Sequence, residues 1–273
     1  MRETICLVIS SKNESVALPK FFEHHVWADE ILVMDSFSTD ATIDVCKKYG
    51  HKFYQQNLAG NANIRLNLAM SLCKTDWVFF TDPDEFISGE LKEEVLSFLS
   101  SKDNRYVAYE SPRINYFMDK RLEHGGWSGY SLKIFRKGFV KFEGNSYHEK
   151  PIVNGAIGKL KGGVVHYPNP NIHWFVEKFN YISEFDLSVY YERYGVLSVR
   201  RFKWLLITKP LKIFWKCYIK KEGYKDGLQG FIYAFLIWAF DTIRICKYGE
   251  RFIVKNPNLS PKDKLPDPWE CRK

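Results

Sequence analysis

Two carboxylates separated by a single proline, Asp82 and Asp84, follow directly after the apolar run Trp77–Phe80. Carboxylates two residues apart on a tight turn can reach one hard cation, and Pro83 stiffens that turn. Oxygen ligands suit Mg²⁺ or Mn²⁺, and such an ion would in turn hold substrate phosphates. The alternative is a solvated turn before a helix, where acidic residues interact favourably with the helix dipole. The position directly after a strand favours the metal site.

Two further polar clusters follow earlier apolar runs. Lys12-Asn13-Glu14 comes shortly after the run Ile5–Ile9, and Asp35-Ser36-Phe37-Ser38-Thr39-Asp40 comes after Glu30–Met34. Ligands of parallel α/β sheets bind outside the carboxyl ends of the strands. We therefore expect all three clusters to meet along one edge of a sheet, which indicates a site more strongly than any one cluster alone.

Single residues of these clusters allow two interpretations. Asp35 ends an apolar strand, and its carboxylate can accept hydrogen bonds from a ribose or a base. Asp40 fits the N-cap of the following helix. Lys12 and Arg65 are the nearest candidates for contact with a diphosphate, and both could equally be solvated surface cations.

The pattern of apolar residues predicts the elements that carry the clusters. The expected strands of the first hundred residues are Ile5–Ile9, Glu30–Met34, Lys52–Tyr54 and Trp77–Phe80, and the expected helices are Val16–Val26, Ala41–Tyr49, Ala62–Cys73 and Leu91–Leu99. Repeated βαβ units predict an α/β fold with a mostly parallel sheet and helices on both faces. Later strands are expected at Tyr106–Glu110, Leu132–Arg136 and Val164–His166. A mostly helical region should run from Asn171 to about Lys247, with breaks near Gly195 and Pro210.

The charge of the chain is concentrated in one segment. The 273 residues include 40 Lys/Arg and 32 Asp/Glu, for a net charge of +8, and 45% are hydrophobic, which excludes a mainly disordered chain. Residues 200–255 contain 13 Lys/Arg and four acids, a net of +9, so the rest of the chain carries −1. Basic residues interleaved with aromatic ones suit an anionic membrane surface. Because the uncharged stretch Gly227–Phe240 is shorter than the roughly 20 residues of a spanning helix, we expect a buried or interfacial helix there.

Cysteine usage and the N-terminus indicate a cytoplasmic protein. None of the six cysteines forms a C-x-x-C pair, so a zinc ribbon or a thioredoxin-like site has no support. The apolar run at Ile5–Ile9 is too short for the core of a signal peptide, and we expect no secretion.

Taken together, the motifs resemble glycosyltransferase family 2, most closely the branch with the lipopolysaccharide core β-1,4-glucosyltransferases. The matching segments of the first part are Val8–Glu14, Trp27–Ile31, Asp35–Asp40, Asp76-Trp77 and Asp82–Glu85. Those of the second part are Arg113–Asn115, His124–Trp127, Leu132–Arg136, Tyr147–Glu149, His166-Tyr167, Gly223, Asp226-Gly227 and Gly230. The resemblance covers roughly residues 4 to 250.

The resemblance implies a GT-A fold, a nucleotide-sugar donor (a UDP-sugar above all), an inverting reaction and a divalent cation, Mg²⁺ or Mn²⁺. The expected domain organisation begins with a catalytic domain at residues 1–170. This domain has a nucleotide-sugar half at about residues 1–100 and an acceptor half at about residues 101–170. A basic, aromatic-rich helical extension follows at 171–255, and a tail at 256–273. The implied acceptor is a lipopolysaccharide core or other surface glycan. The net charge of +9 in residues 200–255 adds the expectation that the enzyme binds peripherally to the inner face of the cell membrane.

The resemblance also assigns roles to residues. Asp82 and Asp84 would lie by the ribose, metal and diphosphate, with His166 as a further metal or phosphate ligand. Asp84 and Glu149 are the catalytic candidates, Glu149 as the general base that deprotonates the acceptor hydroxyl. The remaining nucleotide-sugar contacts are Lys12, Glu14, Asp35, Asp40 and Arg65, and the acceptor contacts are His148 and Trp127.

Several alternatives stay open at this point. Glu149 could pair with Lys150 at the surface, and Trp127, after Gly125-Gly126, could be a buried ring rather than a platform for a sugar. A nucleotidyltransferase acting on sugar phosphates also uses acids on such a sheet, but Ser10–Ser15 lacks the glycines of a phosphate loop. A non-enzymatic membrane- or nucleic-acid-binding module has no need of three acidic clusters, which would repel nucleic-acid phosphates without a metal.

Overall fold

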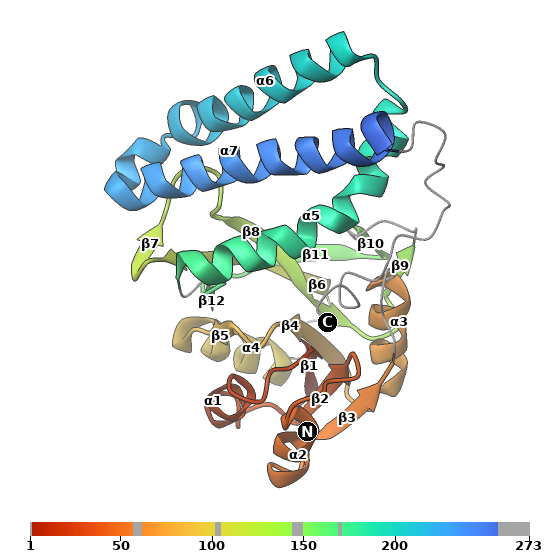
Figure 1. Ribbon diagram of the computed structural model, residues 1–273. Coiled ribbons are helices and arrows are strands. Elements are labelled where there is room, and N and C mark those ends of the chain that lie inside the picture. The colour runs from red at the N-terminus through yellow and green to blue at the C-terminus, as the bar shows by residue number, and fades with distance from the viewer. Residues whose placement is uncertain (1, 57–61, 102–104, 144–149, 169–170, 256–273) are drawn as a thin grey trace. The chain divides into compact units, whose positions relative to one another are not determined.

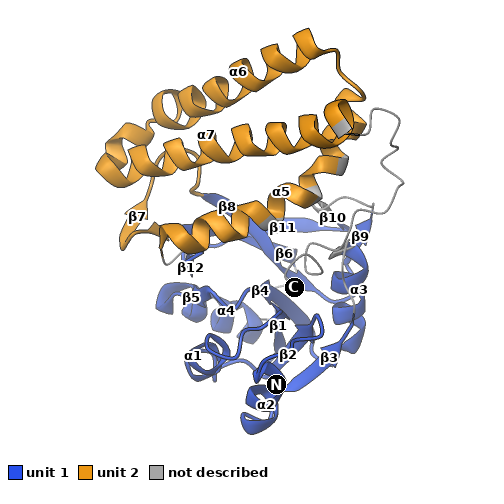
Figure 2. Ribbon diagram, viewed as in Figure 1, with its two compact units in different colours: residues 1–114, 129–168 blue, residues 115–128, 169–273 orange. Residues whose placement is uncertain are grey.

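A computed structural model describes residues 2–56, 62–101, 105–143, 150–168 and 171–255 of the protein (Figure 1). The chain divides into two compact units (Figure 2). The first unit takes in residues 1–114 and 129–168, and the second takes in 115–128 and 169–273. The second unit therefore includes 115–128, a segment inside the stretch that we assigned to the first domain.

The strands and helices follow the expected order with several additions. The strands are β1 (Ile5–Ser11), β2 (Glu30–Asp35), β3 (Lys52–Gln55), β4 (Trp77–Thr81), β5 (Glu85–Ile87), β6 (Tyr106–Phe117), β7 (Lys120–Leu122), β8 (Gly129–Arg136), β9 (Val140–Glu143), β10 (Lys150–Val153), β11 (Ala156–Lys159) and β12 (Val164–His166). The α-helices are α1 (Leu18–His24), α2 (Thr42–Lys48), α3 (Ala62–Leu72), α4 (Gly89–Ser100), α5 (Ile172–Tyr194), α6 (Val199–Trp215) and α7 (Gly227–Gly249). The short strands β5, β7, β9, β10 and β11 lack a sequence pattern strong enough to predict them.

The main sheet has the order β3-β2-β1-β4-β8-β6-β12-β5. Strands β1, β2, β3 and β4 pair in parallel, whereas β8 runs antiparallel to β4 and β6. Alternate residues of β1 supply two cores. Ile5 and Leu7 pack into a cluster with α1 and α4, and Cys6 and Val8 pack into another with α3. Helices thus cover both faces, and the predicted α/β fold class is confirmed.

The connection between β4 and β5 requires the sheet to curl. Three strands separate the two in the sheet, a distance of about 19 Å if the sheet were flat. The four residue steps from Thr81 to Glu85 reach at most about 14 Å when fully extended. In addition, a turn shortens this segment, since Glu85 N donates to Asp82 O at 3.0 Å. The curl therefore brings β12 and β6 towards the carboxyl end of β4.

The second unit is mainly helical, with α5 and α6 packed along α7. Gly195 ends α5 as expected, with a φ of 60°. The expected break at Pro210 is wrong, because α6 continues through it to Trp215. A proline in a helix costs one backbone hydrogen bond, and Pro210 is, with Leu205, one of the buried residues of this helix.

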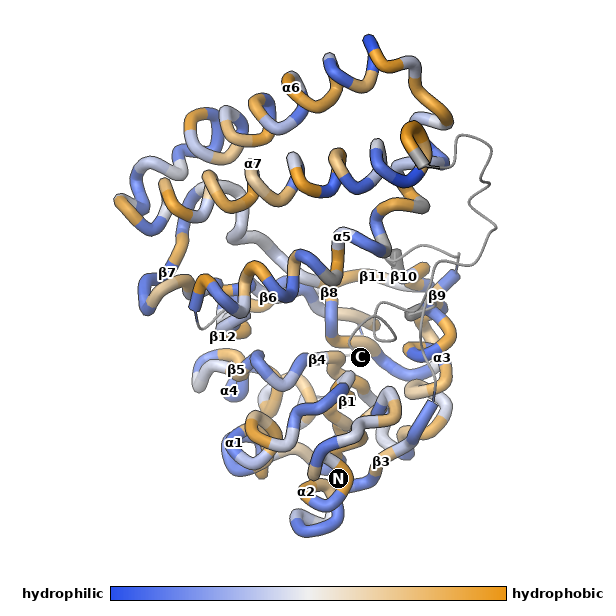
Figure 3. Tube along the Cα trace, in the orientation of Figure 1, coloured by the Kyte–Doolittle hydropathy of each residue, from blue (hydrophilic) through white to orange (hydrophobic). Residues whose placement is uncertain are grey.

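One helical run, Gly223–Val254, is long and apolar enough by length and composition alone to cross a membrane (Figure 3). The core helices of soluble proteins meet the same criterion. Only 28% of its most apolar window is buried, so most of that window does not belong to the core of the second unit.

Candidate active site

The Asp82-Pro83-Asp84 turn lies where β4 ends. All five residues of β4 are buried, so the chain leaves the sheet core only at Asp82. The side chain of Asp82 is 46% exposed and that of Asp84 is 33% exposed. Both carboxylates are therefore accessible to a ligand, while the turn that carries them is closed by a backbone hydrogen bond.

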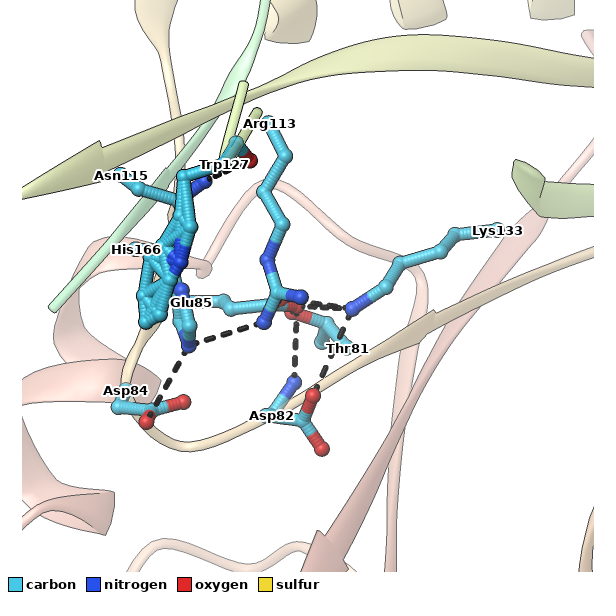
Figure 4. A network of polar contacts seen from close by, with 9 residues as sticks. All are labelled: Thr81, Asp82, Asp84, Glu85, Arg113, Asn115, Trp127, Lys133 and His166. Atoms are coloured by element: carbon cyan, nitrogen blue, oxygen red, sulfur yellow. Dashed lines mark hydrogen bonds and ion pairs between the residues drawn. The ribbon is translucent and has the colours of Figure 1, made fainter. Parts of the chain in front are cut away.

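Directly after the turn, the carboxylate of Glu85 is fully buried and gathers two cations (Figure 4). Lys133 Nζ, from β8, lies 2.7 Å from Glu85 Oε1 and 3.5 Å from Asp82 Oδ2. Arg113 Nη2, from β6, lies 3.0 Å from Glu85 Oε1. Thr81 Oγ1 donates to Glu85 Oε2 at 3.2 Å. Because its charge is satisfied from several sides, Glu85 can hold both cations beside the turn.

His166 approaches the turn from β12. It lies directly opposite Glu85 in the antiparallel pair of β12 and β5. Its Nε2 is 2.9 Å from Arg113 Nη2 and 3.5 Å from Asp84 Oδ2. A guanidinium can only donate hydrogen bonds, so Nε2 accepts this one and its lone pair points at Arg113. A metal ion bound through Nε2 would replace that hydrogen bond.

Asp35 occupies the carboxyl end of β2 and is fully buried. Its Oδ2 accepts hydrogen bonds from Ser38 N at 2.9 Å and from Gln55 Nε2 at 3.0 Å, and Ser38 Oγ donates to its Oδ1. In the parallel register Asp35 is level with Ser11 of β1. These bonds hold the carboxylate at the sheet edge, one strand away from β4.

The loops after β1 and β2 are joined to each other. Lys12 Nζ donates to the carbonyls of Ser36 and Phe37 at 2.7 and 2.6 Å, so its ammonium holds the Asp35 loop. Glu14 N donates to Thr42 Oγ1 at 2.8 Å. The two loops therefore present their polar side chains as one unit.

Asp40, in the second of these loops, is exposed but well hydrogen-bonded. Burial of its carboxylate acts to raise its pKa, and hydrogen bonds from Ser15 and Thr42 outweigh that effect and lower the pKa to about 2. Asp40 accepts a hydrogen bond from the backbone N–H of Thr42, the first residue of α2, which is similar to the N-cap role expected of it.

The chemistry of these residues fits a cation together with an anionic ligand. Asp82 and Glu85 pair with the two cations Lys133 and Arg113, and Asp84, beside His166, adds one formal negative charge in excess. No group of three His, Cys, Asp or Glu side chains within the described ranges could hold a metal without help. Asp84 and His166 do converge, and Mg²⁺ is commonly bound by one or two protein carboxylates with substrate phosphates completing the shell.

Two buried polar atoms support an anionic ligand. The Nε of Arg113 and the Oγ of Ser11 are buried and have no hydrogen-bond partner within the described part of the chain. Buried donors of this kind are costly unless something satisfies them. Both belong to strands that lead to the proposed site, and phosphate or hydroxyl oxygens of a ligand would satisfy them.

The structure brings most of the predicted residues to one edge. Asp35, Asp82 and Asp84 all follow carboxyl ends of neighbouring parallel strands, and β1 alone separates β2 from β4. Arg65 lies on α3, and its buried Nε has no partner among the residues that the structure describes. His148 and Glu149 lie outside the described residues.

Trp127 belongs to the second unit. Its ring packs on Tyr233 with the centroids 4.0 Å apart, and its carbonyl accepts a hydrogen bond from Asn115 at 2.7 Å. The ring is half-buried, so one part of it is packed and another part is open to solvent.

A family model, Glycosyl transferase family 2, matches residues 6–157. That match covers more than half of the chain and includes every element that carries the three acidic clusters. The chain belongs to glycosyl transferase family 2. The family and the observed sheet together confirm the GT-A fold class and a glycosyltransferase enzyme.

Individual relatives align over nearly the whole chain. An uncharacterized glycosyltransferase of Rickettsia conorii is 28% identical, over 96% of this chain and 95% of its own. The lipopolysaccharide core biosynthesis glycosyltransferase LpsC of Rhizobium meliloti is 25% identical, over 93% and 94%. Among solved structures, glucosyl-3-phosphoglycerate synthase from Mycobacterium tuberculosis, in complex with Mn²⁺, UDP and glucosyl-3-phosphoglycerate, has a TM-score of 0.47 and 14% identity, over 72% of this chain and 82% of that one.

The sequence did not predict three residues of this candidate site in these roles. Arg113 and Lys133 occur only within motifs of the family resemblance, and Glu85 only at the end of the segment Asp82–Glu85. Lys133 offers the clearest signal, because a charged side chain between the apolar Leu132 and Ile134 must find a partner when the strand is packed. The identity of that partner depends on the curl of the sheet.

Proposed function

We propose that this enzyme transfers a sugar, with inversion, from a nucleotide-sugar to a surface-glycan acceptor. The observation that carries the proposal is the convergence of Asp84, His166, Arg113 and Lys133 on the turn after β4. A nucleoside diphosphate leaving group needs positive charge at this position, and the sheet edge supplies both cations and candidate ligands for a metal ion.

We assign each part of the donor to residues of the first unit. Asp35, with Lys12, Glu14 and Asp40 in the joined loops beside it, would contact the nucleoside, and we take a UDP-sugar as the donor from the family resemblance. Asp82 would lie by the ribose. Arg65 stays a candidate for the diphosphate.

Asp84 and His166 would hold Mg²⁺ or Mn²⁺, with Asp82 as a third ligand. The ion would supply Lewis-acid stabilisation of the charge that develops on the diphosphate. Arg113 and Lys133 act on the same charge. Glu85 holds both in place before the donor binds, so little reorganisation is needed during the reaction.

Inversion requires a base on the acceptor side. We propose Glu149 for this role, with His148 beside it, because a single displacement at the anomeric carbon needs a carboxylate that takes the acceptor proton. Trp127 is the candidate acceptor contact in the second unit. Its half-buried ring leaves a surface on which a sugar could stack.

The proposed acceptor is a lipopolysaccharide core or another lipid-linked envelope glycan. The relative LpsC carries the core-biosynthesis description and aligns over 93% of this chain. We accordingly propose that residues 1–170 form the catalytic domain, that 171–255 form a basic extension, and that the enzyme works at the cytoplasmic face of the membrane.

A donor panel tests the proposal. Purified enzyme is incubated with UDP-, GDP-, ADP- and CMP-sugars and with Mg²⁺ or Mn²⁺, and release of the nucleotide is measured with and without lipopolysaccharide core acceptors. We expect metal-dependent release of a nucleoside diphosphate from one donor class. Release of pyrophosphate from a nucleoside triphosphate and a sugar phosphate would instead identify a nucleotidyltransferase. The variant Asp44→Asn, which changes an exposed acid on α2, serves as a matched control.

A further inference from the structure

Helix α6 carries a row of exposed apolar side chains along its length. Trp204, Ile207, Leu211 and Trp215 are 62, 60, 55 and 56% exposed. Their spacing of three, four and four residues puts them on one side of the helix. The opposite side, which includes Leu205, is buried in the second unit, so the exposed row is additional to the core.

The row continues onto α7 through aromatic contacts. Leu228, Phe231 and Phe235 of α7 are 68, 43 and 48% exposed. The ring centroid of Phe214, from α6, lies 6.2 Å from that of Phe231, and the rings of Phe231 and Phe235 are 6.4 Å apart. We call the exposed side chains of Trp204, Ile207, Leu211, Trp215, Leu228, Phe231 and Phe235 the α6–α7 apolar face. An exposed patch of this kind marks an interaction surface.

Positive charge surrounds this face. Residues 199–221 contain eight Lys/Arg and no Asp or Glu. At 100° per residue, Arg201 and Lys212 lie on one flank of the α6 row and Lys203 lies on the other. Lys216 directly follows the helix, and all four are exposed. The ammonium of Lys212 is 5.5 Å from the centre of the Trp204 ring.

We infer that the α6–α7 apolar face docks the enzyme in the plane of an anionic bilayer surface. The apolar row would enter the boundary between headgroups and acyl chains, where tryptophan is favoured, and the flanking cations would contact anionic headgroups. This inference rests on the proposed function in one respect, since a lipid-linked acceptor explains why a soluble-type catalytic fold would bind a membrane.

Two other arrangements fit the charges less well. If the helical run Gly223–Val254 crossed the bilayer, it would carry the charged side chains of Asp241 and Arg244 near its centre at high cost. The span from Arg201 to Lys216 is about 22 Å along the helix, so an α6 that crossed the bilayer would likewise carry cations along its length. In a symmetric dimer through the same face, the cations of one copy would meet the same cations of the other. An anionic lipid surface instead neutralises them.

The test is flotation of the full-length protein with phosphatidylcholine vesicles that contain either no phosphatidylglycerol or 30% phosphatidylglycerol. We expect binding to the anionic vesicles at low salt and its loss at high salt. Neutralising three flanking cations, in Arg201→Gln/Lys212→Gln/Lys216→Gln, should weaken binding about 100-fold. Trp204→Ser/Trp215→Ser should weaken it at least about tenfold.

The matched control is Val16→Ser/Val26→Ser, which removes two apolar side chains of the first unit that are 92 and 81% exposed. It should bind vesicles like the unchanged protein. Nucleotide release from the donor in solution should be the same for all these variants, so a failure of the enzyme proposal and a failure of the surface proposal are separable.

Three results would overturn the inference: equal binding to neutral and anionic vesicles, unchanged binding by both sets of face variants, or a dimer in solution that Trp204→Ser/Trp215→Ser abolishes while no vesicles bind. Resistance of the bound protein to extraction at pH 11 would overturn the in-plane arrangement. Circular dichroism of each variant shows that the helices have folded.

Discussion

The ammonium of Lys133 lies 2.7 Å from Oε1 of Glu85, a carboxylate whose side chain has no exposed surface. The same ammonium is 3.5 Å from Asp82 Oδ2. Glu85 therefore holds a cation at the edge of the turn that we propose for the diphosphate. Lys133 can therefore have two separable roles: the ion pair stabilises the fold, and we propose that the cation also stabilises the leaving group.

Replacing Lys133 by Met should lower both stability and activity. The lost charged hydrogen bond costs about 2 kcal/mol of unfolding free energy, and loss of a preorganised cation lowers kcat about 100-fold. The double variant Glu85→Gln/Lys133→Met should recover much of the stability but not the activity. Urea unfolding and steady-state rates measure the two effects, with Lys141→Met, an exposed lysine of the first unit, as the control. Recovery of activity in the double variant would show that Lys133 is only structural.

Asp84→Asn should lower transfer by about 1,000-fold, because the variant weakens the proposed metal site. Removing divalent ions with EDTA should abolish activity in the unchanged protein, and Mn²⁺ or Mg²⁺ should restore it. Binding of Mn²⁺, followed by electron paramagnetic resonance, should weaken in Asp84→Asn and in His166→Asn. Full activity in EDTA would contradict the metal assignment.

Asp35→Asn should raise the KM for the donor by about 10- to 100-fold with a smaller effect on kcat, since a charge-assisted hydrogen bond to the nucleoside is lost away from the reacting centre. The buried site already supplies hydrogen bonds from Ser38 and Gln55, which an amide oxygen can still accept in part. Titration of free UDP by calorimetry checks the effect directly. An unchanged affinity for UDP would remove Asp35 from the nucleoside site.

Glu149→Gln should keep donor affinity and lose transfer, because the amide cannot take the proton of the acceptor hydroxyl. The experiment compares UDP binding with the rate of product formation. If the variant transfers sugar at the normal rate, the base must be sought elsewhere, and Glu149 then takes the alternative role of a surface partner for Lys150.

His25 should make the first unit less stable in mild acid. Burial of the ring lowers the pKa of His25 to about 4, although the hydrogen bond that Nδ1 donates to Phe21 O acts to raise it. The Nε2 atom accepts a hydrogen bond from Ile87 N. The unfolded chain takes up a proton as the pH falls below about 6.5, whereas the folded protein does so only near pH 4. Stability is therefore complete above pH 6.5 and decreases by about 2 kcal/mol between pH 7.5 and 5.

Urea unfolding at these two pH values measures the change. His25→Gln should flatten the dependence, and His173→Gln, which removes a histidine that is 78% exposed, should leave it unchanged. An equal slope in His25→Gln would exclude His25 as its source.

The amino-acid sequence by itself determined the alternating strands and helices, the position of Asp35, Asp82 and Asp84 at strand ends, and the basic character of residues 199–221. Each of these depends on local order along the chain: period-two and period-3.6 patterns, turn residues and charge counts. The parallel sheet then places consecutive carboxyl ends at one edge without further information.

Only the tertiary structure decided which partners meet at that edge. Glu85, Arg113, Lys133 and His166 come from β5, β6, β8 and β12, which are consecutive in the sheet, and the curl of the sheet brings these strands to the turn after β4. Likewise, the apolar side chains of α6 could be core or surface until packing against α7 showed which side of the helix was covered. Long-range pairing is set by the summed packing of many strands and helices, and no local pattern of residues encodes it.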